Sequence, residues 1–324
     1  MRYVDVFNGD ADGICALHQL RLSDPRPDAA LVTGVKRDIA LLARISEIEN
    51  SSITVLDVSL DRNREYLMKL LGRGNSILYI DHHFSGPVPT SDQLEIHIDP
   101  QPMICTSVIV DSLLHGRYRP WAIAGAFGDN LDETALELAG KMMFDEEQIE
   151  ALRATGILLN YNGYGATLDD LYFPPDELYR QVRSYEDPFA FYAESEAMEI
   201  LRSGYQDDMS RALAAEPLLE DDHGRIYQLA GEPWARRVAG VFSNTLAREQ
   251  PDKAHGLIIP NGDGTLRISV RAPLSNRTGA DVLCRRFPTG GGRAAAAGIN
   301  YLPPEQSKKF LDAFMEHFGK VADQ

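Results

Sequence analysis

Acidic residues follow three apolar, β-branched runs of the chain and one apolar helical segment. Residues 8–13 read Asn-Gly-Asp-Ala-Asp-Gly after the first run, Asp57 ends the third run, and Asp81-His82-His83 follows the fourth. Gly128-Asp129-Asn130 follows the helical segment. Because the carboxyl ends of parallel strands meet at one edge of a sheet, we expect the first three groups to lie close together there.

This predicted cluster needs a cation, because carboxylates at close range raise one another's pKa. No run of Lys or Arg occupies the same turns, so divalent ions are the natural compensation, and imidazole ligands favour manganese, zinc or iron over calcium. Asp10 and Asp12 can point to different ions and Asp57 can bridge them, which predicts a two-metal site that activates water for attack on phosphorus. Taken singly, an Asp-x-Asp-Gly turn is more often a helix cap, but the four motifs together favour the metal site.

The elements that must position these residues alternate between strands and helices over the first 145 positions. Apolar runs at 3–7, 30–35, 53–58 and 77–80 predict strands, and apolar residues at helical spacing, for example over 39–45, lie between them. This order predicts right-handed βαβ units around a parallel sheet.

Two domains joined by a connector are expected, because 324 residues exceed what one hydrophobic core usually organises. An α/β domain with the parallel sheet covers residues 1–190, an acidic helical connector 191–222, and a smaller C-terminal α/β domain 223–324. In the last of these, runs at 226–229, 255–259 and 266–270 predict strands, and Gly290–Gly292 predicts a loop.

Charge and composition narrow the class of protein. The net charge of −16 argues against binding of long nucleic acid, yet residues 223–324 carry 14 basic and 9 acidic side chains, a net charge of +5. The sequence contains no run of about 18 apolar residues, so we predict no membrane span. Its first residues do not resemble a signal peptide. Three cysteines without a CxxC pair fit a reducing compartment, so we expect a cytoplasmic protein.

The order of the acidic motifs resembles that of the DHH phosphoesterase superfamily, which is named for its Asp-His-His. Residues 267–271, 290–293 and 296–298 are similar to the substrate-binding domain associated with it. The superfamily includes RecJ-type exonucleases, nano-RNases, cyclic-dinucleotide phosphodiesterases, exopolyphosphatases and family II pyrophosphatases. The resemblance implies an α/β fold with an N-terminal parallel-sheet DHH domain, a C-terminal α/β domain, and hydrolase activity that depends on two divalent ions, manganese being favoured and magnesium the alternative.

The resemblance also implies a role for each residue of the motifs. One ion would be held by Asp10 and Asp57, with Asn8 as a weak ligand, and the other by Asp12, Asp57, His82 and Asp129. Asp81 would orient the histidines, and His83 would face the phosphate to stabilise charge or donate a proton. The substrate would be bound in the C-terminal domain by Ser269, Arg271, Gly290, Gly291, Gly292 and Arg293.

Two residues depart from the family's patterns. Asn8 stands where RecJ-type members have Asp, and Arg293 stands where the glycine segment usually ends in His. An amide oxygen is a poorer metal ligand than a carboxylate, and arginine binds phosphate but does not shuttle protons at neutral pH. A non-catalytic nucleotide-binding relative is therefore the alternative from another class.

The predicted reaction is hydrolysis of phosphodiester bonds in short oligonucleotides or dinucleotides. Exopolyphosphatase activity is the runner-up, because a chain of phosphates needs only cations to bind it. We expect the chain to bind a small phosphorylated substrate and to bind neither a long nucleic-acid duplex nor a membrane. A homodimer is possible. Lys36 and Arg37 could reach the phosphate or simply begin a helix, and residues 160–165 could stack a base or form a turn.

Overall fold

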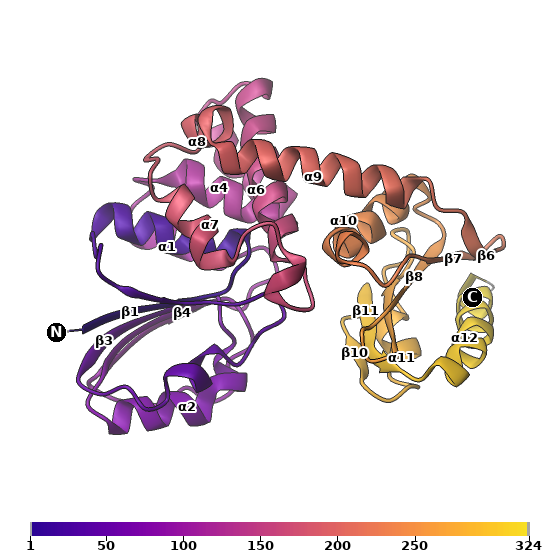
Figure 1. Ribbon diagram of the computed structural model, residues 1–324, viewed down its shortest axis with the longest axis horizontal. Helices are drawn as coiled ribbons and strands as arrows, with labels where there is room; N and C mark the ends of the chain where they lie inside the picture. The colour runs from indigo at the N-terminus through magenta and orange to yellow at the C-terminus, as the bar shows by residue number, and fades with distance from the viewer. Residues whose placement is uncertain (1, 323–324) are drawn as a thin grey trace. The chain divides into compact units, whose positions relative to one another are not determined.

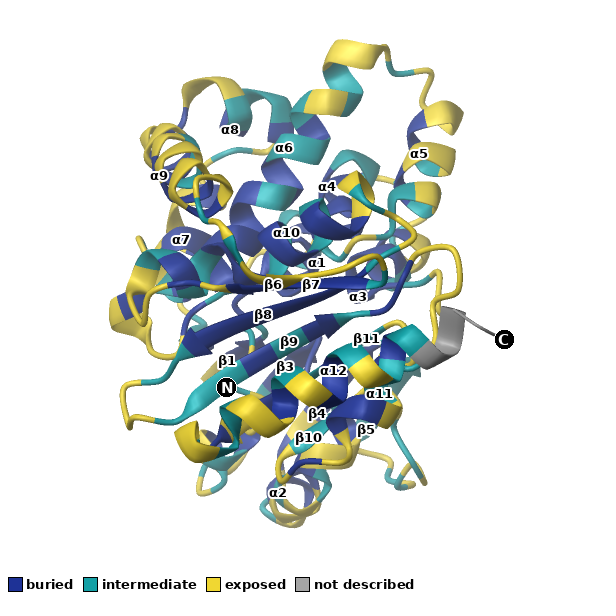
Figure 2. Ribbon diagram, turned by 90° about the vertical axis from the view of Figure 1, so that its right-hand side faces the viewer, coloured by how far each residue is buried: buried dark blue, intermediate teal, exposed yellow. Residues whose placement is uncertain are grey.

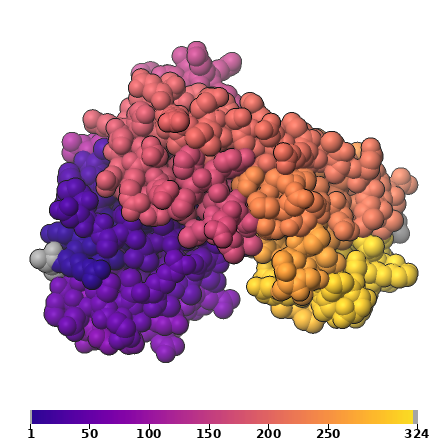
Figure 3. Space-filling view, in the orientation of Figure 1, coloured from indigo at the N-terminus to yellow at the C-terminus, as the bar shows by residue number. Residues whose placement is uncertain are grey.

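The computed structural model describes residues 2–322. The chain separates into two compact units, Met1–Ser203 and Gly204–Gln324. The division falls inside the helix α9 (Glu196–Leu213), which lies in the segment for which the sequence predicts a helical connector. In the space-filling view the colour runs from indigo in the first unit to yellow at the end of the second (Figure 3).

The first unit is built on a sheet of five parallel strands. In space the strands follow the order β2-β1-β3-β4-β5. Their bounds are β1 (Arg2–Phe7), β2 (Ala30–Val32), β3 (Ser51–Leu56), β4 (Ser76–Asp81) and β5 (Leu94–Ile98). The predicted parallel-sheet α/β domain is therefore confirmed.

Helices cover both faces of this sheet, with α1 and α2 on opposite faces (Figure 1). The elements are α1 (Ala11–Ser23), α2 (Leu60–Gly72), α3 (Thr106–Leu113), α4 (Arg119–Gly128), α5 (Asp132–Lys141), α6 (Glu146–Gly163), α7 (Pro175–Val182), α8 (Pro188–Glu194), and the short 3-10 helices η1 (Leu41–Ile45) and η2 (Leu168–Asp170). The apolar spacing over 39–45 belongs to η1, so a helix exists there but is only a short 3-10 turn. Its Leu41, Leu42 and Ile45 are buried against the sheet with α2.

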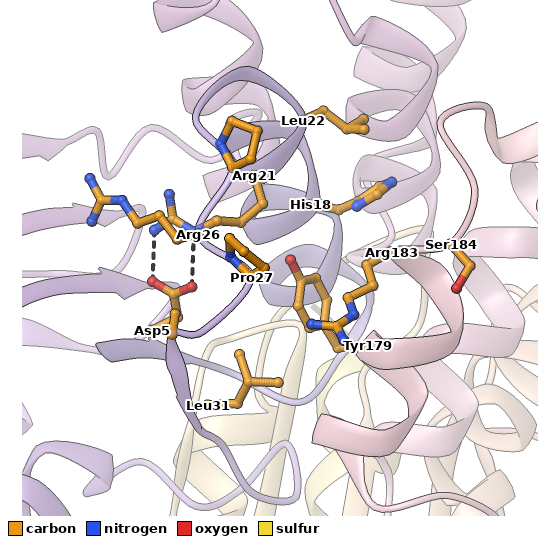
Figure 4. Close-up of a pocket in the computed structure, with 12 residues that line it drawn as sticks. Asp5, His18, Arg21, Leu22, Arg26, Pro27, Leu31, Tyr179, Arg183 and Ser184 are labelled. Atoms are coloured by element: carbon orange, nitrogen blue, oxygen red, sulfur yellow. Dashed lines mark hydrogen bonds and ion pairs between the residues drawn. The ribbon is translucent and has the colours of Figure 1, made fainter. Parts of the chain in front are cut away.

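A buried ion pair joins β1 to α1 (Figure 4). The Asp5 carboxylate is 1% exposed and accepts hydrogen bonds from Arg21 Nε at 2.9 Å and Arg21 Nη2 at 2.6 Å. Arg21 Nη2 also donates to Thr54 Oγ1 on β3, at 2.8 Å. The pair lines a cavity of about 290 Å³ together with His18, Tyr179 and other side chains.

We expect His18 to make the first unit less stable in mild acid. The ring is buried, its Nε2 bonds to the Tyr185 carbonyl oxygen at 2.8 Å, and burial lowers its pKa from 6.5 to about 4. As the pH falls from 6.5 toward 4, the unfolded chain therefore takes up a proton that the folded chain refuses, so stability is lost in that window. The loss is about 2 kcal/mol between pH 7 and pH 5.

Urea unfolding at the two pH values, followed by the fluorescence of Trp121, measures this loss. His18→Gln keeps an N–H donor without a titrating ring, and we expect the variant to lose about 2 kcal/mol less than the native chain over the same interval. Trp234→Phe in both proteins removes the signal of the second unit. Equal pH dependence of the two proteins would contradict the prediction.

The second unit holds a mixed sheet of six strands in the order β10-β11-β9-β8-β7-β6, in which β7 and β8 pair in parallel and the other neighbours are antiparallel. This is the smaller C-terminal α/β domain that the sequence predicts. Its elements are β6 (Pro217–Glu220), β7 (Gly224–Gln228), α10 (Pro233–Glu249), β8 (Ala254–Pro260), β9 (Leu266–Arg271), α11 (Ala280–Cys284), β10 (Gly290–Gly292), β11 (Ala296–Leu302), η3 (Pro304–Gln306) and α12 (Ser307–Ala322).

The core of this unit lies between the sheet and the helices α11 and α12. Ile268 and Val270 of β9 pack there with Phe310 and Phe314 of α12, and β8 is buried almost throughout (Figure 2). The glycine triplet predicted as a loop is instead the edge strand β10, paired with β11. A Cβ atom on Gly290 would lie 1.8 Å from the Cys284 carbonyl oxygen, so this close approach needs glycine. Among the described residues, no helix is both long and apolar enough to cross a membrane.

Candidate metal centre

The turn between β1 and α1 places the first two aspartates. Asp10 is the N-cap of α1, and its Oδ1 accepts a hydrogen bond from the Gly13 N–H at 3.1 Å. A Cβ on Gly13 would lie 2.2 Å from the Asn8 carbonyl oxygen, so a larger residue would open this turn. Burial favours the neutral form of Asp10, but Lys36 and the Gly13 N–H lower the pKa of its carboxyl overall.

Asp12 caps a different helix. Its two carboxylate oxygens accept the backbone N–H groups of Thr106 and Ser107, both at 2.8 Å, at the start of α3. The positive end of that helix favours a carboxylate. Asp12 is almost fully buried. The structure thus gives this predicted metal ligand a structural task that the sequence does not reveal.

Asp57 follows β3 directly and adopts a φ of +57°, in the left-handed region that few residues other than glycine occupy. Its Oδ1 lies 3.4 Å from His82 Nε2 and 3.7 Å from His83 Nδ1, and it accepts a hydrogen bond from Thr106 Oγ1 at 3.3 Å. Burial, with the negative charges of Asp10 and Asp12, raises the pKa of the Asp57 carboxyl well above its usual range. A bound cation would remove this electrostatic cost.

The two histidines of the Asp81-His82-His83 segment have different hydrogen-bond partners. Asp81 is the last residue of β4, is fully buried, and accepts a hydrogen bond from His83 Nδ1 at 2.7 Å. His82 Nδ1 instead bonds to the Ile104 carbonyl oxygen at 2.9 Å, which turns Nε2 toward Asp57. Asp81 therefore orients one of the two histidines by a direct hydrogen bond, and a backbone carbonyl orients the other.

Both histidines favour the charged form in this acidic setting. Burial would lower the pKa of His82, but its hydrogen bond to Asp57 and the charges of Asp12 and Asp57 raise it to about 10. Burial also opposes the charge on His83, whereas Asp81 and Asp57 raise its pKa to about 9. Two imidazoles among these carboxylates partly compensate the negative charge of the cluster.

Asp129 and Lys36 complete this edge of the sheet. Asp129 ends α4, and its Oδ2 lies 3.7 Å from His82 Nε2. Burial raises the pKa of the Asp129 carboxyl, an effect that Lys36 opposes. Lys36 Nζ lies 2.6 Å from Asp10 Oδ2 and 3.4 Å from Asp129 Oδ1. The place of Lys36 after the second strand indicates that it could reach the site, but not that its ammonium pairs with Asp10 and Asp129.

A cavity of about 260 Å³ opens over these side chains. Its lining includes Asn8, Asp10, Lys36, Asp57, His82, His83 and Asp129, together with Asp38, Ile39, Val58, Ser59 and Arg62. Asp12 and Asp81 stand outside this lining. Ligand atoms of Asp57, His82 and His83 lie within 4.8 Å of one another, and the buried Asn8 Oδ1 has no hydrogen-bond partner among the described residues. These donors fit one divalent ion of the borderline type that accepts both oxygen and imidazole nitrogen.

The predicted substrate-binding residues belong to the second unit. Ser269 on β9 pairs with Gly298 on β11, which pairs in turn with Gly291 on β10, so the three residues form a row across three strands. Arg271 Nε donates a hydrogen bond to Asn244 Oδ1 of α10 at 2.9 Å. Arg293 is exposed in the turn between β10 and β11, where its backbone N–H bonds to the Ala296 carbonyl oxygen. The flanking Gly290 and Gly292 pair with Ile299 and Ala297. Binding of substrate by these residues stays a prediction.

Residues 160–165 take neither of the two forms considered from the sequence over most of their length. Asn160 to Gly163 form the last turn of α6, and Tyr161 is fully buried. Asn160 Oδ1 instead accepts a hydrogen bond from Lys36 Nζ at 3.0 Å. This contact joins α6 to the acidic cluster, and a base has no access to the buried ring.

Solved structures resemble the chain over almost its whole length. A DHH-domain protein described as a member of the s1p family of ribosomal proteins matches with a TM-score of 0.61 at 14% identity, over 97% of this chain and 86% of that one. A manganese-bound RecJ exonuclease matches with a TM-score of 0.60 at 15% identity, over 98% and 90% of the two chains. The pGpG-specific phosphodiesterase PggH of Vibrio cholerae matches with a TM-score of 0.59 at 12% identity, over 98% and 99%.

The chain therefore has the fold of the DHH-domain proteins, as the order of its motifs predicts. No family model matches the sequence, and no curated protein matches it by sequence. At these low identities the likeness establishes the fold, and activity has to be argued from the residues of the site.

Proposed function

We propose that this chain is a metal-dependent phosphoesterase. The observation that carries the proposal is the cluster at the carboxyl edge of the parallel sheet, where the buried Asp57, the half-buried His82 and the exposed His83 bring ligand atoms within 4.8 Å of one another beside a cavity. A divalent ion bound there supplies Lewis acidity, which polarises a phosphoryl oxygen and lowers the pKa of water. Because the pKa of the buried Asp57 carboxyl is raised, a bound ion would stabilise the charged form of this residue.

In this proposal His83 acts on the substrate phosphate. The 2.7 Å hydrogen bond from Nδ1 to Asp81 holds the ring, leaving Nε2 for a ligand in the cavity that His83 lines. From that position His83 can stabilise charge on the phosphate or donate a proton to the leaving oxygen. Asp81 is a positioning residue, because its carboxylate contacts the histidine from outside the cavity lining.

For the substrate we favour short oligonucleotides or dinucleotides, with manganese as the ion and magnesium as the alternative. The net charge of +5 over residues 223–324 supports an anionic ligand in the second unit, where Ser269, Gly298 and Gly291 form a row. Two proteins with this fold are described as an exonuclease and a pGpG-specific phosphodiesterase. RecJ structures of this fold have been determined with Mn²⁺ or Mg²⁺.

Incubation of the full chain and Mn²⁺ with dinucleotides, short oligonucleotides, cyclic dinucleotides and polyphosphate tests the proposal. We expect cleavage of a linear dinucleotide to mononucleotides, and loss of this activity in EDTA. Release of inorganic phosphate from polyphosphate alone would transfer the assignment to an exopolyphosphatase. A chain that binds nucleotides but hydrolyses none of these substrates with either ion would be the non-catalytic relative.

We expect His83→Gln to lower kcat about 100-fold, with a smaller change in KM, because the lost group acts on charge that develops during the reaction. His97→Gln is the matched control: His97 Nε2 bonds to Glu95 at 2.9 Å, two residues away, on the edge strand β5. The control should keep the native kcat. A His83→Gln variant with native kcat would remove His83 from the reaction.

A further inference from the structure

The ammonium group of Lys36 is surrounded like a bound ion. Its Nζ lies 2.6 Å from Asp10 Oδ2, 3.0 Å from Asn160 Oδ1 and 3.4 Å from Asp129 Oδ1. The three oxygens come from the start of α1, from α6 and from the end of α4. An ammonium has three N–H groups, so each has one oxygen to which it can donate. Elements distant in sequence thus converge on one side chain.

The backbone also holds Lys36 at this place. Its N–H donates to the Gly163 carbonyl oxygen at 2.9 Å, in the last turn of α6, and the Tyr164 ring centre lies 5.6 Å from Nζ. Only about a fifth of the side chain is exposed. Because both its backbone and its ammonium group are bound, Lys36 has a fixed position in the site, unlike a surface lysine whose side chain moves freely in solvent.

Lys36 therefore already pairs with Asp10 Oδ2, the carboxylate oxygen that a first metal ion would need as a ligand. In the two-metal arrangement implied by the resemblance, that ion is held by Asp10 and Asp57, with Asn8 as a weak ligand. A divalent ion on Asp10 Oδ2 would lie close to the Lys36 ammonium, and like charges at such separations repel strongly. The neutral Asn8 does not offset this repulsion, whereas the carboxylate of RecJ-type members would.

We propose that Lys36 takes the place of the first metal ion, so that the chain holds a single divalent ion beside Asp57 and His82. The inference rests on the proposed function, since it assigns part of the work of a metal centre to a side chain. Lys36 would neutralise Asp10 and present a fixed positive charge to the substrate phosphate. The single ion would supply its chemistry on the His82 side of the cavity.

Manganese stoichiometry tests this directly. The folded full-length chain is equilibrated with Mn²⁺ by dialysis, the bound ion is counted by elemental analysis, and EPR distinguishes an isolated Mn²⁺ from an exchange-coupled pair. We expect the native chain to bind about one ion with an isolated spectrum. Lys36→Met and Lys36→Gln should each bind about one ion more and show a coupled spectrum.

Further variants separate charge from fold. Lys36→Arg keeps the positive charge and should keep the native stoichiometry, while Lys141→Met removes an exposed lysine of α5 and should change nothing. Using both the Met and the Gln variant guards against one of them failing to fold, as checked by circular dichroism.

Each other outcome overturns the inference. A coupled pair in the native chain would show that Lys36 moves aside, and the proposed phosphoesterase would stand. Unchanged stoichiometry in both neutral variants would show that Lys36 does not exclude an ion. A native chain that binds no manganese and hydrolyses nothing would end the inference and the proposed function together.

Discussion

Asp57→Asn is expected to reduce hydrolysis strongly while making the metal-free protein more stable. In the native chain the Asp57 carboxylate is buried beside Asp10 and Asp12, and burial with their charges raises its pKa despite the nearby histidines. A neutral amide removes this cost, and asparagine adopts the left-handed backbone at +57° more readily than most residues. We expect a gain of about 1 to 2 kcal/mol in the free energy of unfolding in EDTA.

Activity should change in the opposite direction. The amide is a neutral and poorer ligand than the carboxylate that lies 3.4 Å from His82 Nε2, so the variant should lose its divalent ion and about a thousandfold in kcat/KM. Manganese should raise the unfolding free energy of the native chain, by mass action, and leave that of the variant unchanged.

Urea unfolding in EDTA and in Mn²⁺, with dinucleotide hydrolysis on the same samples, measures both effects. Asp92→Asn, at an exposed position in the loop before β5, is the control and should match the native chain in every assay. A variant at Asp57 that is less stable in EDTA, or that hydrolyses at the native rate, would contradict the account of this carboxylate.

Arg21→Met is expected to destabilise the first unit by about 3 to 5 kcal/mol. The change leaves the Asp5 carboxylate, 1% exposed, without the two hydrogen bonds at 2.6 and 2.9 Å that now compensate its charge (Figure 4). Thr54 Oγ1 also loses its donor. An uncompensated charge inside a protein costs much more than the loss of a surface pair.

A double-mutant cycle identifies the cause. Adding Asp5→Asn to Arg21→Met removes the stranded charge, so the double variant should recover most of the lost stability, as measured by urea unfolding. Arg180→Met breaks an exposed ion pair with Asp176 on α7 and should cost less than about 1 kcal/mol. If the double variant is as unstable as Arg21→Met alone, lost packing rather than a buried charge explains the effect.

The sequence predicts the strands that carry the site, for a physical reason. β1, β3 and β4 lie inside the parallel sheet, so their residues form apolar runs, and polar turns mark where each run ends. β5, at the edge, is only partly buried and alternates apolar with polar residues over five positions, which is too short a pattern to predict a strand. β10 consists of glycines, whose pattern does not distinguish a loop from an edge strand that needs close backbone approach.

The site shows the same limit at the level of contacts. Asp10, Asp57 and Asp81 could be placed at one edge because each ends a strand or follows one. The contacts of Lys36 with Asp129 and Asn160 span 93 and 124 positions, and a single lysine in a turn carries no pattern that indicates them. The division of the histidines between Asp81 and the Ile104 carbonyl also depends on a loop whose path the sequence does not specify.

In the Asp-Ala-Asp-Gly turn each of the two aspartates caps a helix, and this affects which residues we expect evolution to retain. Asp10 caps α1, and Asp12 closes the start of α3 through two backbone hydrogen bonds. A descendant released from selection for hydrolysis would still lose stability if either aspartate were replaced, whereas Asp57 carries an electrostatic cost without its ion and would be replaced early. We therefore expect the first motif to persist in relatives that have lost hydrolysis, and Asp57 to persist in relatives that keep it.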